Sequence, residues 1–326
     1  MSRPSSAAVS EPGKDRLSPD PAAWLRERSY HHSSYTAARI AAERGLSVSV
    51  CLPARECAGT VGEIVQALAG LRGAGAIDEI VVIDAGSADG TAGVAERAGA
   101  TVHQEDELMP SHGPVLGKGD AMWRSLPVLS GELICFLDAD TESFSAHFAT
   151  GLLGPLICER GVSFVKAYYR RPLSDGAGAA DSAGVDGTGT DSAGAVAREG
   201  GGRVNHLTAR PALGLFYPQL AEVRQPLAGE VAGRRELFER LPFTTGYGIE
   251  IAMLIDVWQA IGLNGIAQVD LDEHRNRHQP LAALEPMAAT VLATIARRLE
   301  REGRLTGPPV AGAPVERPPV ARVPVA

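Results

Sequence analysis

Leu133-Ile134-Cys135-Phe136-Leu137-Asp138-Ala139-Asp140 runs five apolar residues directly into two carboxylates. A continuous apolar run of this length is typical of a strand that is buried on both faces in the middle of a parallel sheet. Ligands of open α/β sheets bind just beyond the carboxyl ends of such strands. The run therefore predicts that Asp138 and Asp140 lie where a binding site would be.

The two carboxylates are close enough in the sequence to repel each other unless positive charge lies between or beside them. A hard divalent cation with oxygen ligands would supply that charge and would bring a phosphate ligand with it. Alternatively, Asp138 caps the next turn and Asp140 is solvated, because this short pattern also arises by chance. The pattern alone leaves both interpretations open.

The composition is that of a globular protein with a sizeable core, because 44% of the 326 residues are hydrophobic and 21% are charged. The net charge of −8 argues against a nucleic-acid partner. No apolar stretch approaches the roughly 20 residues that span a bilayer, and residues 1–20 lack the apolar core of a signal peptide. The four cysteines form no CxxC pair, which favours buried thiols in a reducing compartment. These features predict a cytoplasmic protein without a membrane span.

Strand and helix patterns alternate along the chain with short connections. This alternation predicts an α/β fold with a right-handed, mostly parallel sheet flanked by helices. Apolar runs predict strands at residues 47–52, 79–84, 100–103, 133–137, 162–169 and 266–271. Helical spacing of apolar residues predicts helices at 21–44, 60–71, 91–97, 118–129, 204–209, 234–240, 249–261 and 284–301.

Three segments have compositions that cannot bury a core. Residues 1–20 are rich in Ser, Pro and charge and are predicted to be a disordered tail. Residues 174–200 are almost entirely Gly, Ala, Ser, Asp and Thr, which predicts a flexible surface insertion. Residues 306–326 are rich in Pro, Val and Ala and are predicted to form a second disordered tail.

Asp84 and Lys118 lie at the ends of predicted elements, where a ligand would bind. Asp84 ends the second strand and could accept hydrogen bonds from a base or a ribose, although Asp and Gly in the turn that follows also serve backbone geometry. Lys118 lies between Gly117 and Gly119 at a helix start, where glycines, the helix dipole and a point charge favour an anion. A solvated lysine is the alternative.

Gly200-Gly201-Gly202-Arg203-Val204-Asn205 places an arginine after three glycines at a helix start. Arginine binds phosphate or carboxylate in a bidentate manner, so this is a candidate anion site. A flexible hinge at the end of the 174–200 insertion is the other interpretation.

Acidic, imidazole and cationic groups stand at three further places. Glu250 follows Tyr247 in the first turn of a predicted helix, where the dipole favours it and where it could orient a hydroxyl. His274-Arg275-Asn276-Arg277-His278 combines imidazole with groups that suit a polyanion, unless it is a basic surface loop. His31 and His32 could bind a metal or could be surface histidines.

In this order, the motifs resemble those of the actinobacterial glucosyl-3-phosphoglycerate synthases, which are retaining glycosyltransferases of the GT-A fold. The resemblance runs from about Ser47 to Arg301. Its most specific parts are the triple glycine with arginine and the His-Arg-Asn-Arg run. The motifs that carry it are Leu52-Pro53-Ala54-Arg55-Glu56, Asp84-Ala85-Gly86-Ser87-Ala88-Asp89-Gly90-Thr91, Gly117-Lys118-Gly119, Asp138-Ala139-Asp140, Gly201-Gly202-Arg203-Val204, Gly246-Tyr247-Gly248-Ile249-Glu250 and His274-Arg275-Asn276-Arg277.

The resemblance implies a GT-A domain over residues 21–305, with a nucleotide-sugar half over about 46–142 and a helical acceptor half over about 143–305. It implies transfer of glucose from UDP-glucose to the 2-hydroxyl of 3-phosphoglycerate with retention of configuration. The reaction would depend on Mg²⁺, or on Mn²⁺ in its place. The resemblance further implies a homodimer whose product leads toward methylglucose lipopolysaccharide or glucosylglycerate.

The resemblance also implies roles for individual residues. Glu250 and Asp138 would be catalytic, and Asp140 and His274 would bind the metal. The acceptor would be held by Gly202, Arg203, Asn205, Asn276 and Arg277. The donor would be held by Pro53, Ala54, Glu56, Asp84, Lys118, Asp138, Ala139, Tyr247 and Glu250.

The chain departs from its relatives near the expected base pocket. Glu56-Cys57 stands where they commonly have Asn-Glu, and Ala85 stands where they have Ser, which leaves GDP-glucose or GDP-mannose open as donors. A different acceptor and a non-catalytic nucleotide-sugar binding protein are further alternatives. The intact Lys118 and His274, with both carboxylates after the strand, argue against the non-catalytic reading.

Overall fold

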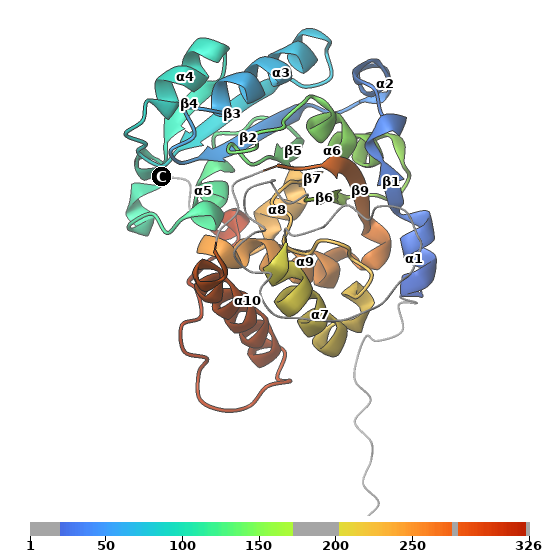
Figure 1. Ribbon diagram of the computed structural model, residues 1–326, viewed down its shortest axis with the longest axis vertical. Helices are drawn as coiled ribbons and strands as arrows, with labels where there is room; N and C mark the ends of the chain where they lie inside the picture. Colours follow the sequence, from blue (N-terminus) through green and yellow to red (C-terminus); the bar gives the residue numbers. More distant parts are fainter. Residues whose placement is uncertain (1–19, 172–201, 276–279, 324–326) are drawn as a thin grey trace, which may run out of the picture.

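An eight-stranded sheet forms the centre of the computed structural model, which describes residues 20–171, 202–275 and 280–323. Its strand order is β1-β9-β6-β7-β5-β2-β3-β4 (Figure 1). β7 runs antiparallel to both of its neighbours, and the other neighbouring strands pair in parallel. The expected α/β fold with a mostly parallel sheet is therefore confirmed. The strands are β1 Ser29–His31, β2 Val48–Ala54, β3 Glu79–Asp84, β4 Thr101–Gln104, β5 Leu133–Phe136, β6 Phe164–Arg170, β7 Val231–Arg234 and β9 Ile266–Glu273.

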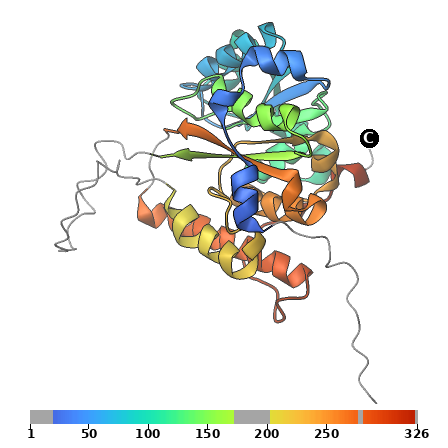
Figure 2. The same cartoon turned by 90° about the vertical axis from the view of Figure 1, so that its right-hand side faces the viewer.

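Helices cover both faces of the sheet (Figure 2). Apolar side chains of one group of helices pack with one face, and this group comprises α2 Ala37–Glu43, α3 Val61–Gly73, α4 Thr91–Ala98 and α6 His147–Cys158. Side chains of a second group pack with the other face, and this group comprises α1 Pro21–Glu27, α5 Lys118–Ser125, α7 Arg210–Phe216, α8 Arg235–Arg240, α9 Ile249–Ile261 and α10 Leu281–Arg301.

β5, which leads to Asp138 and Asp140, lies in the middle of the sheet and is covered by helices on both sides. Leu133 and Cys135 belong to the core on one face of the sheet, and Ile134 and Phe136 belong to the core on the other. All four are at most 1% exposed. Alternate side chains of a strand point to opposite faces, so an unbroken apolar run is what a strand covered on both sides requires.

Two predicted boundaries are wrong. β2 continues through Pro53, which was expected to end the strand, because β5 pairs with β2 only as far as Cys51 and leaves that edge free for a residue without an N–H. The predicted helical segment 21–44 is divided by β1, which pairs in parallel with β9. A strand of three residues whose partner is about 240 positions away has no local signal.

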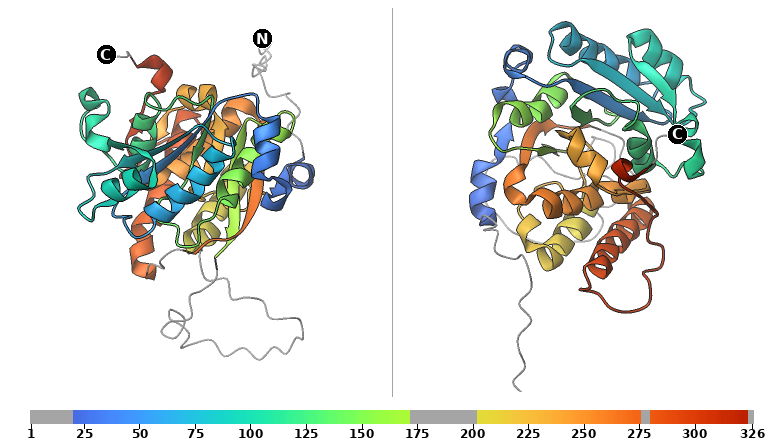
Figure 3. Two further views of the ribbon diagram at one scale, coloured as in Figure 1. Left: turned by 90° about the horizontal axis from the view of Figure 1, so that it is seen from above. Right: turned by 180° about the vertical axis from the view of Figure 1, so that it is seen from behind.

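The C-terminal segment corrects the expectation of a disordered tail over residues 306–326. Its described part returns from α10 toward α5 (Figure 3) and forms β10 Glu316–Arg317, which pairs antiparallel with β8 Phe243–Thr244. Trp123 Nε1 donates to the carbonyl of Pro318 at 2.7 Å. The prediction failed because composition alone does not show that Glu316 and Arg317 pair with buried charged residues. We call residues 314–318 the C-terminal brace.

The other predicted low-complexity regions lie almost wholly outside the described residues. These are the N-terminal tail, of which only Asp20 is described as the N-cap of α1, and the insertion 174–200. Within the described ranges, no helix has both the length and the apolar composition to cross a bilayer.

Candidate functional site

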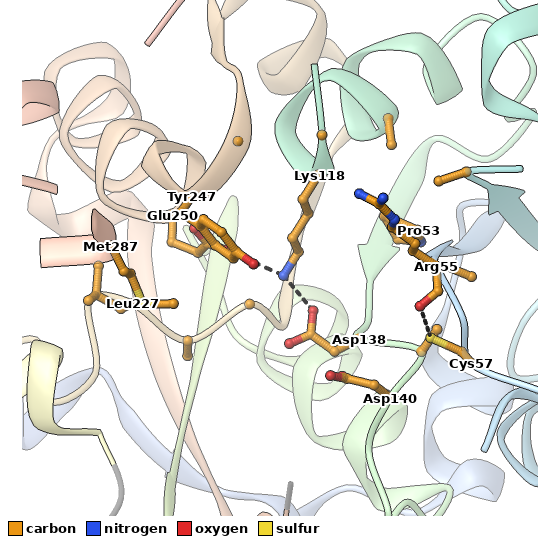
Figure 4. A pocket seen from close by; sticks show the side chains of 18 of the residues that line it. Pro53, Arg55, Cys57, Lys118, Asp138, Asp140, Leu227, Tyr247, Glu250 and Met287 are labelled. Carbon is orange, nitrogen blue, oxygen red and sulfur yellow. Dashed lines mark hydrogen bonds and ion pairs between the residues drawn. The ribbon is translucent and has the colours of Figure 1, made fainter. Parts of the chain in front are cut away.

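A cavity of about 770 Å³ opens beyond the carboxyl ends of β2, β3 and β5, as the sequence predicted for this fold (Figure 4). Its walls combine strand ends, turns and helix starts from both halves of the chain. They comprise Pro53–Arg55 and Cys57, Ile83 with residues 85–86, 105–106, the start of α5, 138–140, Tyr169, Arg171, 202–205, 227–229, 246–247, Glu250 and one side of α10.

Lys118 lies at the centre of the cavity and joins its two halves (Figure 4). Its ammonium donates to Asp138 Oδ1 at 2.5 Å and lies 3.1 Å from Glu250 Oε1. Burial by itself would lower the pKa of Lys118, but the two carboxylates hold it well above its ordinary value. A permanently charged lysine therefore holds Asp138 and Glu250 within reach of one ligand.

Glycines allow the backbone to approach this ion pair closely. A Cβ atom at Gly229 would overlap the Lys118 ammonium and both carboxylate oxygens of Asp138. A Cβ atom at Gly119 would overlap the carbonyl oxygen of Thr244. The glycine on the C-terminal side of Lys118 thus serves the packing of α5 against β8, in addition to any contact with an anion.

Asp140 and His274, the expected metal ligands, lie differently with respect to the cavity. Asp140 lines it, and burial together with repulsion from Asp138 raises the Asp140 pKa. His274 is 1% exposed and lies behind the wall, where its Nε2 is 3.0 Å from Glu230 Oε1 and 3.2 Å from Thr141 Oγ1.

Asp140 and His274 each offer a ligand atom that could hold a divalent cation. The buried Nδ1 of His274 has no hydrogen-bond partner among the described residues. A carboxylate at one ring nitrogen and an unpartnered second nitrogen are the arrangement that orients a histidine ligand. Burial raises the Glu230 pKa, but the interactions with His274, Lys118 and Arg171 outweigh it and lower the pKa to about 2. Glu230 therefore stays charged.

The expected donor residues divide into cavity-lining and supporting groups. Pro53, Ala54 and Ala139 line the cavity, whereas Glu56 and Asp84 are absent from its wall. Glu56 accepts a hydrogen bond from Ala88 N at 2.9 Å, and Asp84 accepts one from Ser87 N at 3.1 Å. The second carboxylate oxygen of Asp84 is buried without a described partner. Both side chains therefore shape the turn beside the cavity, which is the structural alternative left open for Asp84.

The expected acceptor residues that the structure describes lie together. Gly202, Arg203 and Asn205 line the same cavity as Asp138, and Tyr247 lines it as well. Asn205 Oδ1 is buried and has no described hydrogen-bond partner, whereas its Nδ2 donates to Arg224 O at 3.3 Å. Asn276 and Arg277 lie outside the described residues.

Several cavity residues were not predicted to have a role. Arg171 donates from Nη2 to the Tyr169 hydroxyl at 2.9 Å, and that hydroxyl donates to Glu230 Oε2 at 2.9 Å. Tyr169 also stacks on His274 with ring centroids 4.4 Å apart. Tyr169 ends the predicted strand 162–169 and Arg171 follows it, so the strand-end argument applied to Asp138 would have identified Arg171.

Glu105 and Arg55 line the cavity beyond β4 and β2 and were also missed. Burial, with repulsion from Asp120 adding to it, raises the Glu105 pKa to about 7. The cavity thus holds four cationic side chains, those of Arg55, Lys118, Arg171 and Arg203, together with the five acidic side chains of Glu105, Asp106, Asp138, Asp140 and Glu250. Such a site suits a polyanionic ligand that is bound together with a divalent cation.

The amino-acid sequence is similar to those of known glycosyltransferases. The sequence profile of Glycosyl transferase family 2 matches residues 49–157. The glucosyl-3-phosphoglycerate synthase of Mycolicibacterium smegmatis is 42% identical over 276 residues, which cover 84% of this chain and 85% of that protein. The enzyme of the same name from Petrotoga mobilis is 37% identical over 287 residues, covering 86% and 83%.

Two solved structures share the whole architecture. Mannosyl-3-phosphoglycerate synthase from Rubrobacter xylanophilus superposes with a TM-score of 0.81 at 42% identity, covering 94% of this chain and 99% of that one. Glucosyl-3-phosphoglycerate synthase from Mycobacterium tuberculosis, in complex with Mn²⁺, UDP-glucose and phosphoglyceric acid, superposes with a TM-score of 0.74 at 35% identity, covering 90% and 97%. The expected GT-A fold is confirmed.

Proposed function

Because the chain belongs to the glucosyl-3-phosphoglycerate synthase family of glycosyltransferases, we propose that it transfers glucose from UDP-glucose to the 2-hydroxyl of 3-phosphoglycerate with retention of configuration. The observation that carries the proposal is the shared cavity, where Asp140 and the Lys118 ion pairs face Arg203 and Asn205. The solved relative from Mycobacterium tuberculosis holds Mn²⁺, UDP-glucose and phosphoglyceric acid together.

At the donor end, we assign roles to residues according to the negative charge that develops on the departing nucleotide diphosphate. Asp140 and His274 would hold Mg²⁺ or Mn²⁺, which supplies charge neutralisation for the departing nucleotide diphosphate. Lys118 would keep Asp138 and Glu250 in place beside the sugar, because both carboxylates are already its partners. Pro53, Ala54 and Ala139 would contact the nucleoside. Positioning of this kind lowers the barrier to transfer of the sugar.

At the acceptor end, the proposal rests on charge and on one unpartnered oxygen. Arg203 and Arg171 would receive the phosphate and the carboxylate of 3-phosphoglycerate. The buried Asn205 Oδ1, which lacks a described partner, would accept a hydrogen bond from the acceptor hydroxyl. A buried acceptor group without a partner is costly, so a ligand that donates to it stabilises the complex.

A donor-by-acceptor turnover matrix tests the proposal. UDP-glucose, GDP-glucose and GDP-mannose are offered with 3-phosphoglycerate or glycerate, with Mg²⁺, Mn²⁺ or a chelator. We expect release of UDP only with 3-phosphoglycerate and metal, and loss of that activity in Asp140→Ala. Full activity of Asp140→Ala would refute the metal role, and nucleotide-sugar binding without turnover on any pair would favour the non-catalytic alternative.

GDP-mannose is the second candidate donor. It is favoured by the likeness to mannosyl-3-phosphoglycerate synthase from Rubrobacter xylanophilus and by Cys57 and Ala85, which line the cavity where relatives differ. GDP release in the same matrix would transfer the proposal to this donor and leave the acceptor assignment unchanged.

We further propose that the protein is a cytoplasmic homodimer, and that its product leads toward methylglucose lipopolysaccharide or glucosylglycerate. Four cysteines without disulfides support a reducing compartment. Exposed apolar side chains of α7, α10 and the turn after it support an interface, namely Leu215, Phe216, Leu292 and Leu305. Analytical ultracentrifugation of the parent and of Leu215→Glu tests it, since a monomeric parent would contradict the dimer.

A further inference from the structure

We propose that His31, His32 and Asp272 form a second metal site, which takes a transition-metal ion of the Zn²⁺ class and lies outside the catalytic cavity. One ligand atom from each residue lies within 4.8 Å of the others. Within the described residues, this is the group of three or more potential ligands that meets that spacing. None of the three lines the catalytic cavity.

The Asp272 carboxylate already bridges the two imidazoles. Its Oδ1 is 3.3 Å from His31 Nε2, and its Oδ2 is 2.6 Å from His32 Nε2. Zn²⁺ binds nitrogen and carboxylate oxygen at about 2.0–2.2 Å, so its ligand atoms stand roughly 3–4 Å apart. Small side-chain rotations therefore open the present hydrogen-bonded cluster into a coordination sphere.

The backbone and the neighbouring side chains hold the three ligands in place. Asp272 has a φ of +63°, which is unusual for a residue other than glycine, and its N–H donates to Asp270 Oδ1 at 2.9 Å. The Ser33 N–H donates to His31 Nδ1 at 3.2 Å, and Ser33 Oγ lies 2.8 Å from the same nitrogen. Ser33 therefore fixes the His31 ring with its Nε2 turned toward Asp272.

His147 confines His32 but does not compete as a ligand. The two rings lie 4.3 Å apart, and both nitrogens of His147 are engaged, Nδ1 with Ser145 Oγ at 2.5 Å and Nε2 with Leu271 O at 3.1 Å. The nearest competing cation is Arg170, whose Nη2 lies 3.9 Å from Asp272 Oδ1. Its side chain is 64% exposed, so it can turn into solvent when a metal binds.

The three ligands determine which metal the site prefers, and their places in the fold indicate a structural role for the bound ion. Two imidazoles with one carboxylate suit Zn²⁺ and its neighbours, whereas Mg²⁺ prefers oxygen ligands alone. His31 and Asp272 are each about half exposed, which leaves room for water in the remaining positions. A bound ion would fasten β1 and the turn after it to the end of β9, two residues before His274.

The test measures metal binding directly and does not depend on turnover. The full chain, without an added histidine tag, carries Asp140→Ala to remove a ligand of the catalytic site, and Zn²⁺ is titrated in competition with a chromophoric chelator. We expect one tight Zn²⁺ per chain that excess Mg²⁺ does not displace. His31→Ala, His32→Ala or Asp272→Asn should each weaken this binding by at least the ~10–100-fold seen for lost supporting contacts at metal sites.

His103→Ala is the matched control, because His103 lies in β4 at the opposite edge of the sheet from β1. Asn tolerates the left-handed backbone, so Asp272→Asn remains informative if a histidine variant fails to fold. Zn²⁺ should also raise the melting temperature of the Asp140→Ala protein, but not that of its Asp272→Asn derivative. Absence of tight Zn²⁺ binding, or equal affinity in the Asp272→Asn and His103→Ala proteins, would reduce the cluster to an ion pair and overturn the proposal.

Discussion

The donor wall and the C-terminal brace both contact α5 but are built in different ways. We define the donor wall as the turns at residues 53–60, 84–91 and 138–140. Its segments are joined by hydrogen bonds between backbone groups and short polar side chains. Ser87 Oγ accepts from Glu56 N at 2.8 Å, Asp89 Oδ2 accepts from Ala58 N at 2.9 Å, and Thr60 Oγ1 donates to Ala139 O at 2.6 Å.

The C-terminal brace is held by buried charges that are far apart in the sequence. Arg317 forms two hydrogen bonds of 2.7 Å with Asp120, which lies 197 positions away and is fully buried. Glu316 lies 2.9 Å from the buried guanidinium of Arg298, which also donates to Asp256 at 2.6 Å. The donor wall is therefore specified by local motifs, and the brace by pairing that only the folded chain brings about.

The largest effect should come from placing a side chain where the backbone approaches the Lys118–Asp138 ion pair of the donor wall. Gly229→Ala would place a methyl group on the Lys118–Asp138 ion pair and displace one of its members. Misplacement of reacting groups by about 1 Å costs about 100-fold in rate, so we expect kcat to fall by at least that factor. Steady-state kinetics with the donor that the matrix identifies would measure it.

Gly214→Ala is the matched control, because a Cβ atom there meets nothing within 4 Å. It lies in α7, where alanine is favoured over glycine. If Gly229→Ala were as active as Gly214→Ala, the position of Lys118 would not depend on the close approach of the backbone at residue 229.

Breaking the brace should change stability more than chemistry. Arg317→Ala would leave the buried Asp120 with Arg124, 3.3 Å away, and the Leu116 N–H at 2.9 Å. Removing one partner of a buried ion pair costs about 3–5 kcal/mol, and the remaining partners favour the low end of that range. Urea denaturation would measure the free energy of unfolding.

Two further variants separate this ion pair from a general effect of the segment. Arg322→Ala changes an exposed arginine of the same segment and should be nearly neutral. Asp120→Asn combined with Arg317→Ala should recover part of the loss, because the buried carboxylate is then removed as well, while Arg124 keeps its hydrogen bonds to the carbonyls of Met109 and Gly113. A neutral Arg317→Ala would mean that the brace rests on β10 and Trp123 instead.

The difference between local motifs and distant pairing also explains which features could be predicted from the sequence. The central strand, the strand-end position of Asp138, Asp140 and Lys118, and the α/β order all follow from local apolar runs and glycine-flanked polar residues. Those signals fall within a few positions of one another, and the structure places these residues at one cavity.

What the sequence did not indicate depends on distant partners. Glu230 has an ordinary local context, and its importance comes from Tyr169 and His274, which fold beside it. Arg317 lies in a segment whose composition suggests disorder, and only its pairing with Asp120 shows otherwise. Pro53 continues a strand because a neighbouring strand ends earlier.

Arg203→Ala tests whether the acceptor end of the cavity acts independently of the donor wall. The arginine lines the cavity beside Gly202 and Asn205. A hydrogen bond to a charged group is worth about 1.5–3 kcal/mol, so we expect KM for 3-phosphoglycerate to rise about 10–100-fold. Donor affinity, measured by calorimetry with the intact nucleotide sugar, should stay within about twofold. An equal loss of donor and acceptor affinity would contradict the assignment.

The smallest effect concerns Glu105, which lies between the two regions. It lines the cavity, while Asp120, the partner of the brace, contributes to raising its pKa from 4.5 to about 7. The folded protein therefore keeps a proton that the unfolded chain releases between these pH values. The stability that this proton contributes is complete below about pH 4.5 and is lost as the pH rises through 7.

Glu105→Gln imitates the protonated form and should remove this pH dependence. Relative to the parent, its free energy of unfolding should increase from pH 4.5 to pH 7.5 by no more than about 2 kcal/mol once solvent screening is allowed for. Glu107→Gln, an exposed position in the same turn, should follow the parent across the range. If the free energy of unfolding of Glu105→Gln changed with pH in the same way as that of Glu107→Gln, Glu105 would be charged at neutral pH. Asp120, the partner of the brace, would then not raise the Glu105 pKa.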